Sequence, residues 1–521
     1  MNDIERRQLS AGLIVGFPVM AWLAVVHKTE VLPPDHKIRT LYSLITETPH
    51  KPLLIAALAG GLLVGILCAW MLSTLGKTEF SGAAFKRFLR GTKIVSASKL
   101  KSMTTEKNVS QVTVADIPMP TAVENLHLLI GGGTGSGKSV MFREIALGAV
   151  RRKDRIFALD PNGDLMSKFW QPGDKLLNPY DERTEGWSFY NEIRADYDFH
   201  RYSLSIVPRG KTAEAEEWNS YGRLLLRETA KKLAILGQPS VHELFRWTTI
   251  APPEELQEFL AGTLAESLFV GSSEATRAFS SARFVLSDKL PEHLTMPKGL
   301  FSLREWLEDP NGGNLWITWR EDMAEALRPL ISAWTDALFV SILSMPEDPN
   351  RRIWSLIDEL ASLEKLATLE DALTKGRKHG LRVAAGLQST SQLDDIYGRE
   401  KAQTLRSCFS SLAVMRVAKS DPKTAEDFSL SLGEHEVERE RESRGSGGRD
   451  NKQIVHERER VVAPAELTSL PDLTGYIAFV GDRPIAKFQS QYRKFKAQVP
   501  GFVERSATGL PNRPRFATTG A

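Results

Sequence analysis

Residues 132–139 constrain this chain more than any other segment. They match the pattern G-x-x-x-x-G-K-S, follow the apolar run 126–130 and precede a stretch of helical spacing. Such glycines let consecutive backbone N–H groups turn toward phosphate oxygens, while the lysine reaches the β- and γ-phosphates and the serine hydroxyl ligates Mg²⁺. The segment therefore predicts a phosphate loop for ATP and Mg²⁺, formed by Gly132, Gly133, Thr134, Gly135, Ser136, Gly137, Lys138 and Ser139.

Two uncharged apolar stretches precede the phosphate loop, at residues 9–26 and 53–72. Each is long enough to cross a hydrocarbon core of about 30 Å as a helix. Arg6 and Arg7 before the first stretch also suit a signal peptide, but residues 27–30 offer no small-residue cleavage site, so retention is favoured. We expect a membrane anchor at 1–76 with an outer loop at 27–51.

Orientation follows from the flanking charges and from the nucleotide. Basic residues precede the first stretch and follow the second, which favours an orientation with both chain ends in the cytoplasm, where ATP is available. Gly61 and Gly65 form a G-x-x-x-G pair that admits the close approach of another helix; either an oligomer contact or ordinary membrane-helix composition explains it.

The remaining chain alternates short apolar runs with helical segments, which is typical of an α/β fold. Predicted strands at 155–160, 315–319, 353–357, 383–387 and 412–417 favour a parallel sheet covered on both faces. The 521 residues allow two or three domains, and a net charge of +3 does not by itself mark a nucleic-acid binder. Cys68 and Cys408, the two cysteines, form no disulfide framework or zinc pattern.

Residues 185–300 follow a different pattern, since amphipathic helices are expected at 218–236, 241–248, 253–269 and 274–290. We therefore expect an inserted all-α subdomain at 185–300 within a nucleotide-binding domain made of 77–184 and 301–521. The insertion is either a structural cap or a functional module. Residues 434–460, rich in Glu and Arg, are expected to form a solvated flexible loop, although Arg439, Arg441, Arg444, Arg458 and Arg460 could contact nucleic acid.

An acidic pair follows the apolar run 353–357, as in a Walker B segment. Asp358 is expected to hold Mg²⁺, and Glu359 to orient or deprotonate the attacking water. Gln388, at the end of the next predicted strand, either senses the γ-phosphate or caps a turn. Arg377, in a basic segment, either serves a neighbouring subunit as an arginine finger or belongs to a surface turn.

Several segments extend beyond generic ATPase motifs. They are 160–164 (DPNGD), 218–229 (WNSYGRLLLRET), 357–363 (IDELASL) and 386–395 (GLQSTSQLDD). With the apolar pair and the phosphate loop, they resemble the type IV secretion system coupling proteins of bacterial conjugation, the TrwB-like members of the TraD/TraG group. The resemblance covers nearly the whole chain.

The resemblance implies a RecA-like core with an inserted all-α domain, assembled as a homo-oligomer, a hexamer, at the inner membrane. It implies a DNA-stimulated ATP hydrolase that moves single-stranded DNA with its relaxase into a type IV secretion channel. Its partners would be the relaxosome, the inner-membrane components of the channel and membrane lipid. The alternatives are a relaxosome receptor that uses ATP mainly as an assembly switch, and a related motor for protein effectors or double-stranded DNA.

Overall fold

The computed structural model describes residues 3–29, 45–46, 48–74, 85–269, 271, 273–444 and 450–506. Most of the expected outer loop 27–51 and the glycine-rich tip of the charged segment 434–460 therefore lie outside the described residues. The chain consists of two compact units, Met1–Glu79 and Phe80–Ala521.

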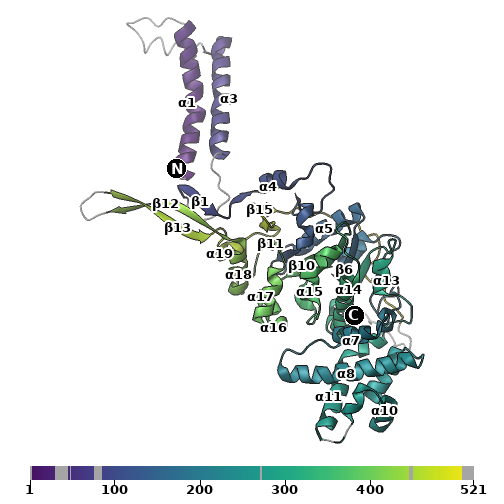
Figure 1. The fold of residues 1–521 in the computed structure, drawn as a ribbon. Helices are drawn as coiled ribbons and strands as arrows, with labels where there is room; N and C mark the ends of the chain where they lie inside the picture. The colour runs from purple at the N-terminus through teal and green to yellow at the C-terminus, as the bar shows by residue number, and fades with distance from the viewer. Residues whose placement is uncertain are drawn as a thin grey trace, which may run out of the picture. The chain divides into compact units, whose positions relative to one another are not determined.

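The first unit is a pair of helices, α1 (Asp3–Thr29) and α3 (Pro52–Thr74), which lie side by side (Figure 1). Each contains a stretch long and apolar enough to cross a membrane, Leu9–Lys28 and Pro52–Met71. Most side chains of these two stretches are not buried by the protein itself, as a lipid-facing surface requires.

The G-x-x-x-G pair is used inside this unit. A Cβ atom on Gly61 would lie 2.7 Å from the carbonyl oxygen of Phe17, and one on Gly65 would lie 2.7 Å from that of Leu13. The absence of side chains at these two positions therefore lets α3 contact the backbone of α1 in the same chain.

A ten-stranded sheet forms the centre of the second unit. Seven strands that are neighbours in space, β11, β5, β10, β9, β6, β8 and β7, run parallel to one another, whereas β14 runs antiparallel to both of its neighbours. The expectation of a wholly parallel sheet was therefore wrong: the sheet is mixed. In spatial order the strands are β2 (Ile94–Ser96), β15 (Ile485–Gln489), β14 (Thr474–Ala478), β11 (Ser411–Met415), β5 (Leu128–Gly131), β10 (Leu381–Leu387), β9 (Ile353–Ile357), β6 (Arg155–Pro161), β8 (Leu315–Trp319) and β7 (Lys175–Leu177).

Both faces of this sheet are covered, as expected. Alternate residues of one strand enter different cores: Ile156 and Ala158 pack with α5 (Lys138–Arg152), whereas Phe157 and Leu159 pack with the core that contains α14. Helix α14 (Ala324–Ser344) satisfies the length and composition of a membrane span, but 78% of its apolar stretch is buried, so it is a core helix.

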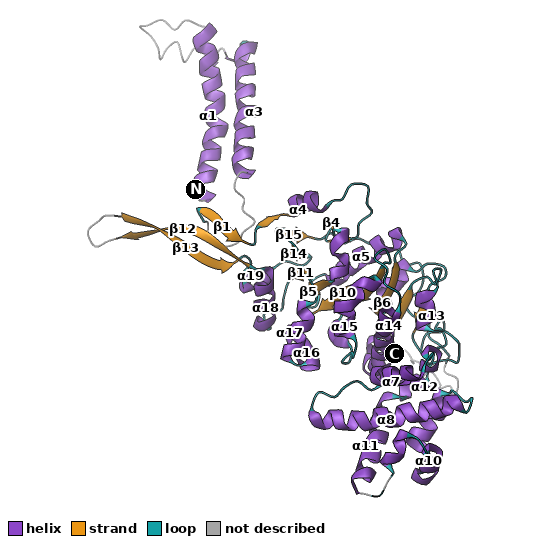
Figure 2. Cartoon of the chain, viewed as in Figure 1, coloured by secondary structure: helices purple, strands orange, loops and turns teal. Residues whose placement is uncertain are grey.

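Helices dominate the segment between β7 and β8 (Figure 2). The long helices α8 and α11 pack against each other, and Gly222 of α8 lies against Val285 of α11. The helices of this segment are α7 (Asp196–Ile206), α8 (Ala213–Ile235), α9 (Val241–Phe245), α10 (Pro253–Leu260), α11 (Ser273–Lys289), α12 (Pro291–Leu294) and α13 (Leu303–Glu308). The remaining helices are α4 (Ala97–Thr104), α6 (Asp164–Phe169), α15 (Leu369–Lys375), α16 (Thr390–Tyr397), α17 (Arg399–Ser407), α18 (Pro422–Leu432) and α19 (Pro464–Ser469).

The charged segment 434–460 is not a loop. It forms the antiparallel strands β12 (Glu434–Arg444) and β13 (Asp450–Arg460), and β12 also pairs with β1 (Arg87–Gly91). A separate two-residue pair joins β3 (Thr113–Val114) to β4 (Ile117–Pro118).

Opposite charges meet across the β12–β13 ladder. Arg458 and Arg460 contact Glu434 at 2.6 and 3.1 Å, and Arg439 contacts Glu459 at 2.7 Å. Such cross-strand pairs stabilise a sheet whose faces carry few apolar residues. These three arginines therefore form ion pairs with glutamates. The side chains of Arg441 and Arg444 lie outside the described part of the chain.

Candidate nucleotide-binding site

The phosphate loop connects β5 to the first turn of α5. Gly137 precedes the helix with φ = +112°, a left-handed conformation that glycine adopts without steric cost. A Cβ atom there would lie only 2.6 Å from Leu473 Cδ2. Backbone conformation and close packing thus both require glycine. No side chain caps the start of α5, where the first N–H groups of a helix bind anions.

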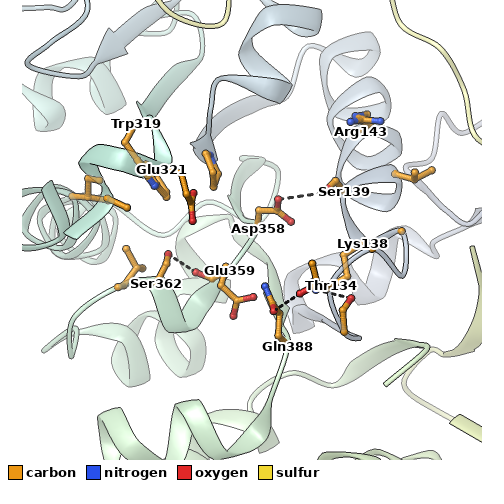
Figure 3. A pocket seen from close by; sticks show the side chains of 18 of the residues that line it. Thr134, Lys138, Ser139, Arg143, Trp319, Glu321, Asp358, Glu359, Ser362 and Gln388 are labelled. Carbon is orange, nitrogen blue, oxygen red and sulfur yellow. Dashed lines mark hydrogen bonds between the residues drawn. The ribbon is translucent and has the colours of Figure 1, made fainter. Parts of the chain in front are cut away.

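Lys138 and Ser139 open α5 at the base of a cleft of about 540 Å³ (Figure 3). The Lys138 ammonium donates a 2.6 Å hydrogen bond to the Gly132 carbonyl oxygen. Burial lowers the pKa of Lys138, an effect that the carboxylates of Glu359 and Asp358 oppose. A buried ammonium held beside a phosphate loop is suited to bind phosphate oxygens as a compact charge.

Strand β9 delivers the two acids, as the sequence predicts. It ends at Ile357, and Asp358 Oδ2 accepts a 3.3 Å hydrogen bond from the Ser139 hydroxyl. Burial raises the pKa of both Asp358 and Glu359, and the Lys138 charge opposes the shift at each of them. The arrangement brings one hydroxyl and one carboxylate to the place where a phosphate-bound Mg²⁺ would sit.

Gln388 extends from the carboxyl end of β10 into the same cleft. Its Oε1 accepts a 3.0 Å hydrogen bond from the Thr134 hydroxyl, which joins the phosphate loop to the sheet (Figure 3). The amide also lies close enough to Glu359 to lower the pKa of that carboxyl, against the effect of burial. Gln388 therefore bonds to the loop and lies beside the candidate general base.

The residues present fit Mg²⁺ in company with a nucleotide. Among the described residues, no group of three or more His, Cys, Asp or Glu side chains could hold a metal by itself. Mg²⁺ commonly takes one or two protein ligands and completes its shell with phosphates and water. Ser139 and Asp358, joined at 3.3 Å, provide that partial set.

Arg377 does not reach this cleft within its own chain. It lies in the short 3-10 helix Gly376–His379, immediately before β10, whereas the cleft lies at the opposite, carboxyl end of that strand. Its side chain is exposed. A role at a phosphate therefore requires the cleft of another subunit.

Several lining residues were not anticipated from the sequence. Trp319 ends β8, Glu321 begins the short 3-10 helix Glu321–Met323, and Arg328 lies in α14. Leu473 and Tyr492 come from the C-terminal part of the chain. None belongs to a local motif, because each reaches the cleft through the order of the strands.

Asp160, near the end of β6, is a buried acid that does not line the cleft. It accepts hydrogen bonds from the N–H groups of Leu165 and Met166 at 2.9 and 2.7 Å, and so anchors the start of α6. Burial is the main cause that raises the pKa of Asp160 to about 7.

These features define a RecA-like P-loop nucleotide-binding protein with an inserted all-α domain. The chain belongs, more narrowly, to the type IV secretion-system coupling proteins, because the family's "coupling protein DNA-binding domain" matches residues 111–491. The expected family and fold class are thereby confirmed.

Known relatives agree with this assignment. Coupling protein TraD of Escherichia coli (strain K12) is 30% identical over 414 residues, which cover 76% of this chain and 57% of TraD. The chain thus spans little more than half the length of TraD.

Solved structures of the plasmid coupling protein TrwB are more similar. TrwB in complex with ADP and Mg²⁺ is 65% identical, with a TM-score of 0.78 over 82% of this chain and 100% of that chain. TrwB in complex with the non-hydrolysable GTP analogue GDPNP is also 65% identical, with a TM-score of 0.77 over 82% of this chain and 99% of that chain. The expectation of a nucleotide with Mg²⁺ is confirmed at the level of these relatives.

Proposed function

We propose that this protein is a membrane-anchored ATPase that couples the relaxase–DNA complex to a type IV secretion channel and pumps single-stranded plasmid DNA during conjugation. The observation that carries the proposal is the set of contacts that joins the phosphate loop and α5 to the side chains at the ends of β9 and β10. Ser139 contacts Asp358, Thr134 contacts Gln388, and Glu359 lines the same cleft. A site for binding alone would not need the second acid.

Each residue has a distinct task in hydrolysis. Lys138 and the backbone of the phosphate loop bind the phosphates, and Ser139 and Asp358 hold Mg²⁺, which neutralises charge on the phosphates when it is bound. Glu359 accepts a proton from the attacking water, and its raised pKa makes it a stronger base than an exposed glutamate. Gln388 holds that water or the γ-phosphate in line.

The oligomer and the membrane complete the proposal. Arg377, exposed and far from its own cleft, acts on the γ-phosphate of the next subunit in a hexameric ring. α1 and α3 anchor the protein in the inner membrane with both termini in the cytoplasm, and the basic flanks of the two helices support this orientation. The helical segment 185–300 engages DNA or the relaxosome.

ATP turnover by the full-length protein in lipid nanodiscs tests the proposal, with and without single-stranded DNA. DNA should stimulate hydrolysis, Lys138→Ala should abolish nucleotide binding, and Glu359→Gln should retain binding but lose turnover. Double-stranded DNA and a protein effector serve as competing stimulants. Nucleotide binding without turnover under every condition would instead indicate a relaxosome receptor with an ATP-dependent assembly switch.

A further inference from the structure

The nucleotide cleft has two chemically different ends. The end with Thr134, Glu359 and Gln388 is polar and faces the expected γ-phosphate. The other end is lined by Val140 and Arg143 of α5 together with Leu473 and Tyr492. Phosphates bound to a phosphate loop place the nucleoside beyond the start of the following helix, so a base would extend toward this second end.

Tyr492 belongs to a strap, residues 490–498, that is fixed on both sides of the cleft. At one side, the Ser490 N–H donates a 2.7 Å hydrogen bond to the Leu473 carbonyl oxygen. At the other, the Gln498 N–H donates a 2.7 Å bond to the carbonyl oxygen of Ser167 in α6. Between these anchors the Phe495 ring packs edge-on against Phe169, with centroids 5.1 Å apart. The strap is therefore held in place before a ligand arrives.

The strap presents the Tyr492 ring at the mouth of the cleft. The side chain is 61% exposed although it lines the cleft, and its ring centroid lies 5.9 Å from the guanidinium carbon of Arg143. Asp164 holds that guanidinium through a 2.8 Å hydrogen bond from Nε. Leu473 is fixed to the phosphate loop, because its N–H donates a 3.0 Å bond to the Ser136 carbonyl oxygen.

Resting on the proposed nucleotide site, we propose that Tyr492 stacks on the purine base of the bound nucleotide and that the site does not discriminate adenine from guanine. A stacked ring accepts the face of any base, whereas discrimination requires donors and acceptors placed along the base edge. At this end of the cleft, Val140 and Leu473 are apolar, and the Arg143 guanidinium is held by Asp164 through Nε and lies against the Tyr492 side chain. The GDPNP complex of TrwB supports a relaxed base preference in a close relative.

Calorimetric titration of the full-length protein in nanodiscs tests the inference, with the β,γ-imido analogues of ATP and GTP and with inorganic tripolyphosphate. Tyr492→Ala should weaken both nucleotide analogues by roughly 5- to 20-fold and to the same extent, because base–aromatic stacking is lost. Tripolyphosphate has no base, so its affinity should not change. Tyr492→Phe should retain nucleotide affinity.

Tyr197→Ala provides the matched control, because Tyr197 is 62% exposed, lies beside an arginine and does not line this cleft. It should leave every affinity unchanged. Unchanged nucleotide affinity in Tyr492→Ala would overturn the inference, and so would an equal loss for tripolyphosphate or a wild-type affinity that differs more than tenfold between the two analogues. Failure of the wild type to bind any of the three probes would instead refute the proposed function itself.

Discussion

Thr134 and Gln388 lie 254 positions apart in the sequence, and the hydroxyl of the first donates a 3.0 Å hydrogen bond to the amide oxygen of the second. The bond connects the phosphate loop, which follows β5, to the tip of the neighbouring strand β10. The phosphate loop is therefore joined directly to a strand of the sheet by a side-chain hydrogen bond.

Replacing Gln388 by alanine should impair the chemical step more than binding. We expect kcat for ATP hydrolysis to fall roughly 100-fold, because one preorganised polar group at the reacting phosphate is lost. KM should change little, since Lys138 and the loop backbone still hold the phosphates. Steady-state ATP titrations separate the two constants, and a raised KM with an unchanged kcat would contradict the sensor role.

Arg377 should act only between subunits. Arg377→Ala and Lys138→Ala proteins should each be inactive, whereas a randomly mixed ring should regain about a quarter of its sites, because an intact loop then meets an intact arginine. Hydrolysis assays after subunit mixing measure this recovery. Lys378→Ala, which changes the adjacent exposed cation, should remain active by itself. No recovery in the mixture would exclude Arg377 as a finger in trans.

His293 should make the fold sensitive to acid. It is 3% exposed, both of its ring nitrogens lack a hydrogen-bond partner among the described residues, and burial lowers its pKa to about 4. The unfolded chain then binds more protons between pH 6.5 and pH 4, so the free energy of unfolding falls as the pH falls through this window.

His293→Phe should remove this dependence and keep a ring beside Trp187, 6.0 Å away. Its stability advantage over the wild type should be larger at pH 5 than at pH 8 in denaturant titrations. His242→Phe, at an exposed position of the same chain, is the control for replacing a histidine by phenylalanine. An equal effect of His293→Phe at both pH values would show that packing alone is responsible.

Glu124 should be needed for stability rather than for catalysis. It is fully buried and accepts hydrogen bonds from Arg152 at 2.6 and 3.1 Å and from Arg382 at 3.0 Å. Glu124→Gln removes the negative charge that the carboxylate provides to two buried arginines. It should therefore lower the free energy of unfolding by roughly 3–5 kcal/mol.

Glu308→Gln is the matched control for this change. Glu308 accepts two bonds from Arg194, at 2.7 and 2.8 Å, but both side chains of the pair are nearly half exposed. Its replacement should cost less than about 1 kcal/mol, because water screens the pair. Denaturant titrations compare the two variants, and equal losses would refute the importance of burial.

Local sequence patterns were sufficient to predict the strands that consist of continuous apolar runs. The strands 315–319 and 353–357 begin and end as predicted, because continuous apolar runs are typical of buried parallel strands. Strand β14 was not among the predicted strands, and its direction could not be predicted in this way, since apolar spacing is the same for either strand direction. The strands β12 and β13 were missed because alternating Glu and Arg resemble a solvated loop until cross-strand pairing is known.

The same distinction applies to the site. Contiguous motifs identified Lys138, Ser139, Asp358 and Glu359, which the structure brings into one cleft. Their chemical roles remain predictions. The opposite wall and Tyr492 could not be found, because they come from segments that meet only through the order of the strands in the folded sheet.

Strand β10 carries a polar residue near each of its ends, Gln388 in its own cleft and Arg377 just before its amino end. Its seven residues span about 20 Å and are hydrogen-bonded to neighbours on both sides, which makes the strand stiff. In the proposed ring, strand β10 would thus connect residues at two nucleotides in adjacent subunits, Gln388 at one and Arg377 at the other. A displacement of Gln388 by the phosphate at one end would move Arg377 at the other, so that the subunits would hydrolyse ATP one after another without any further coupling element.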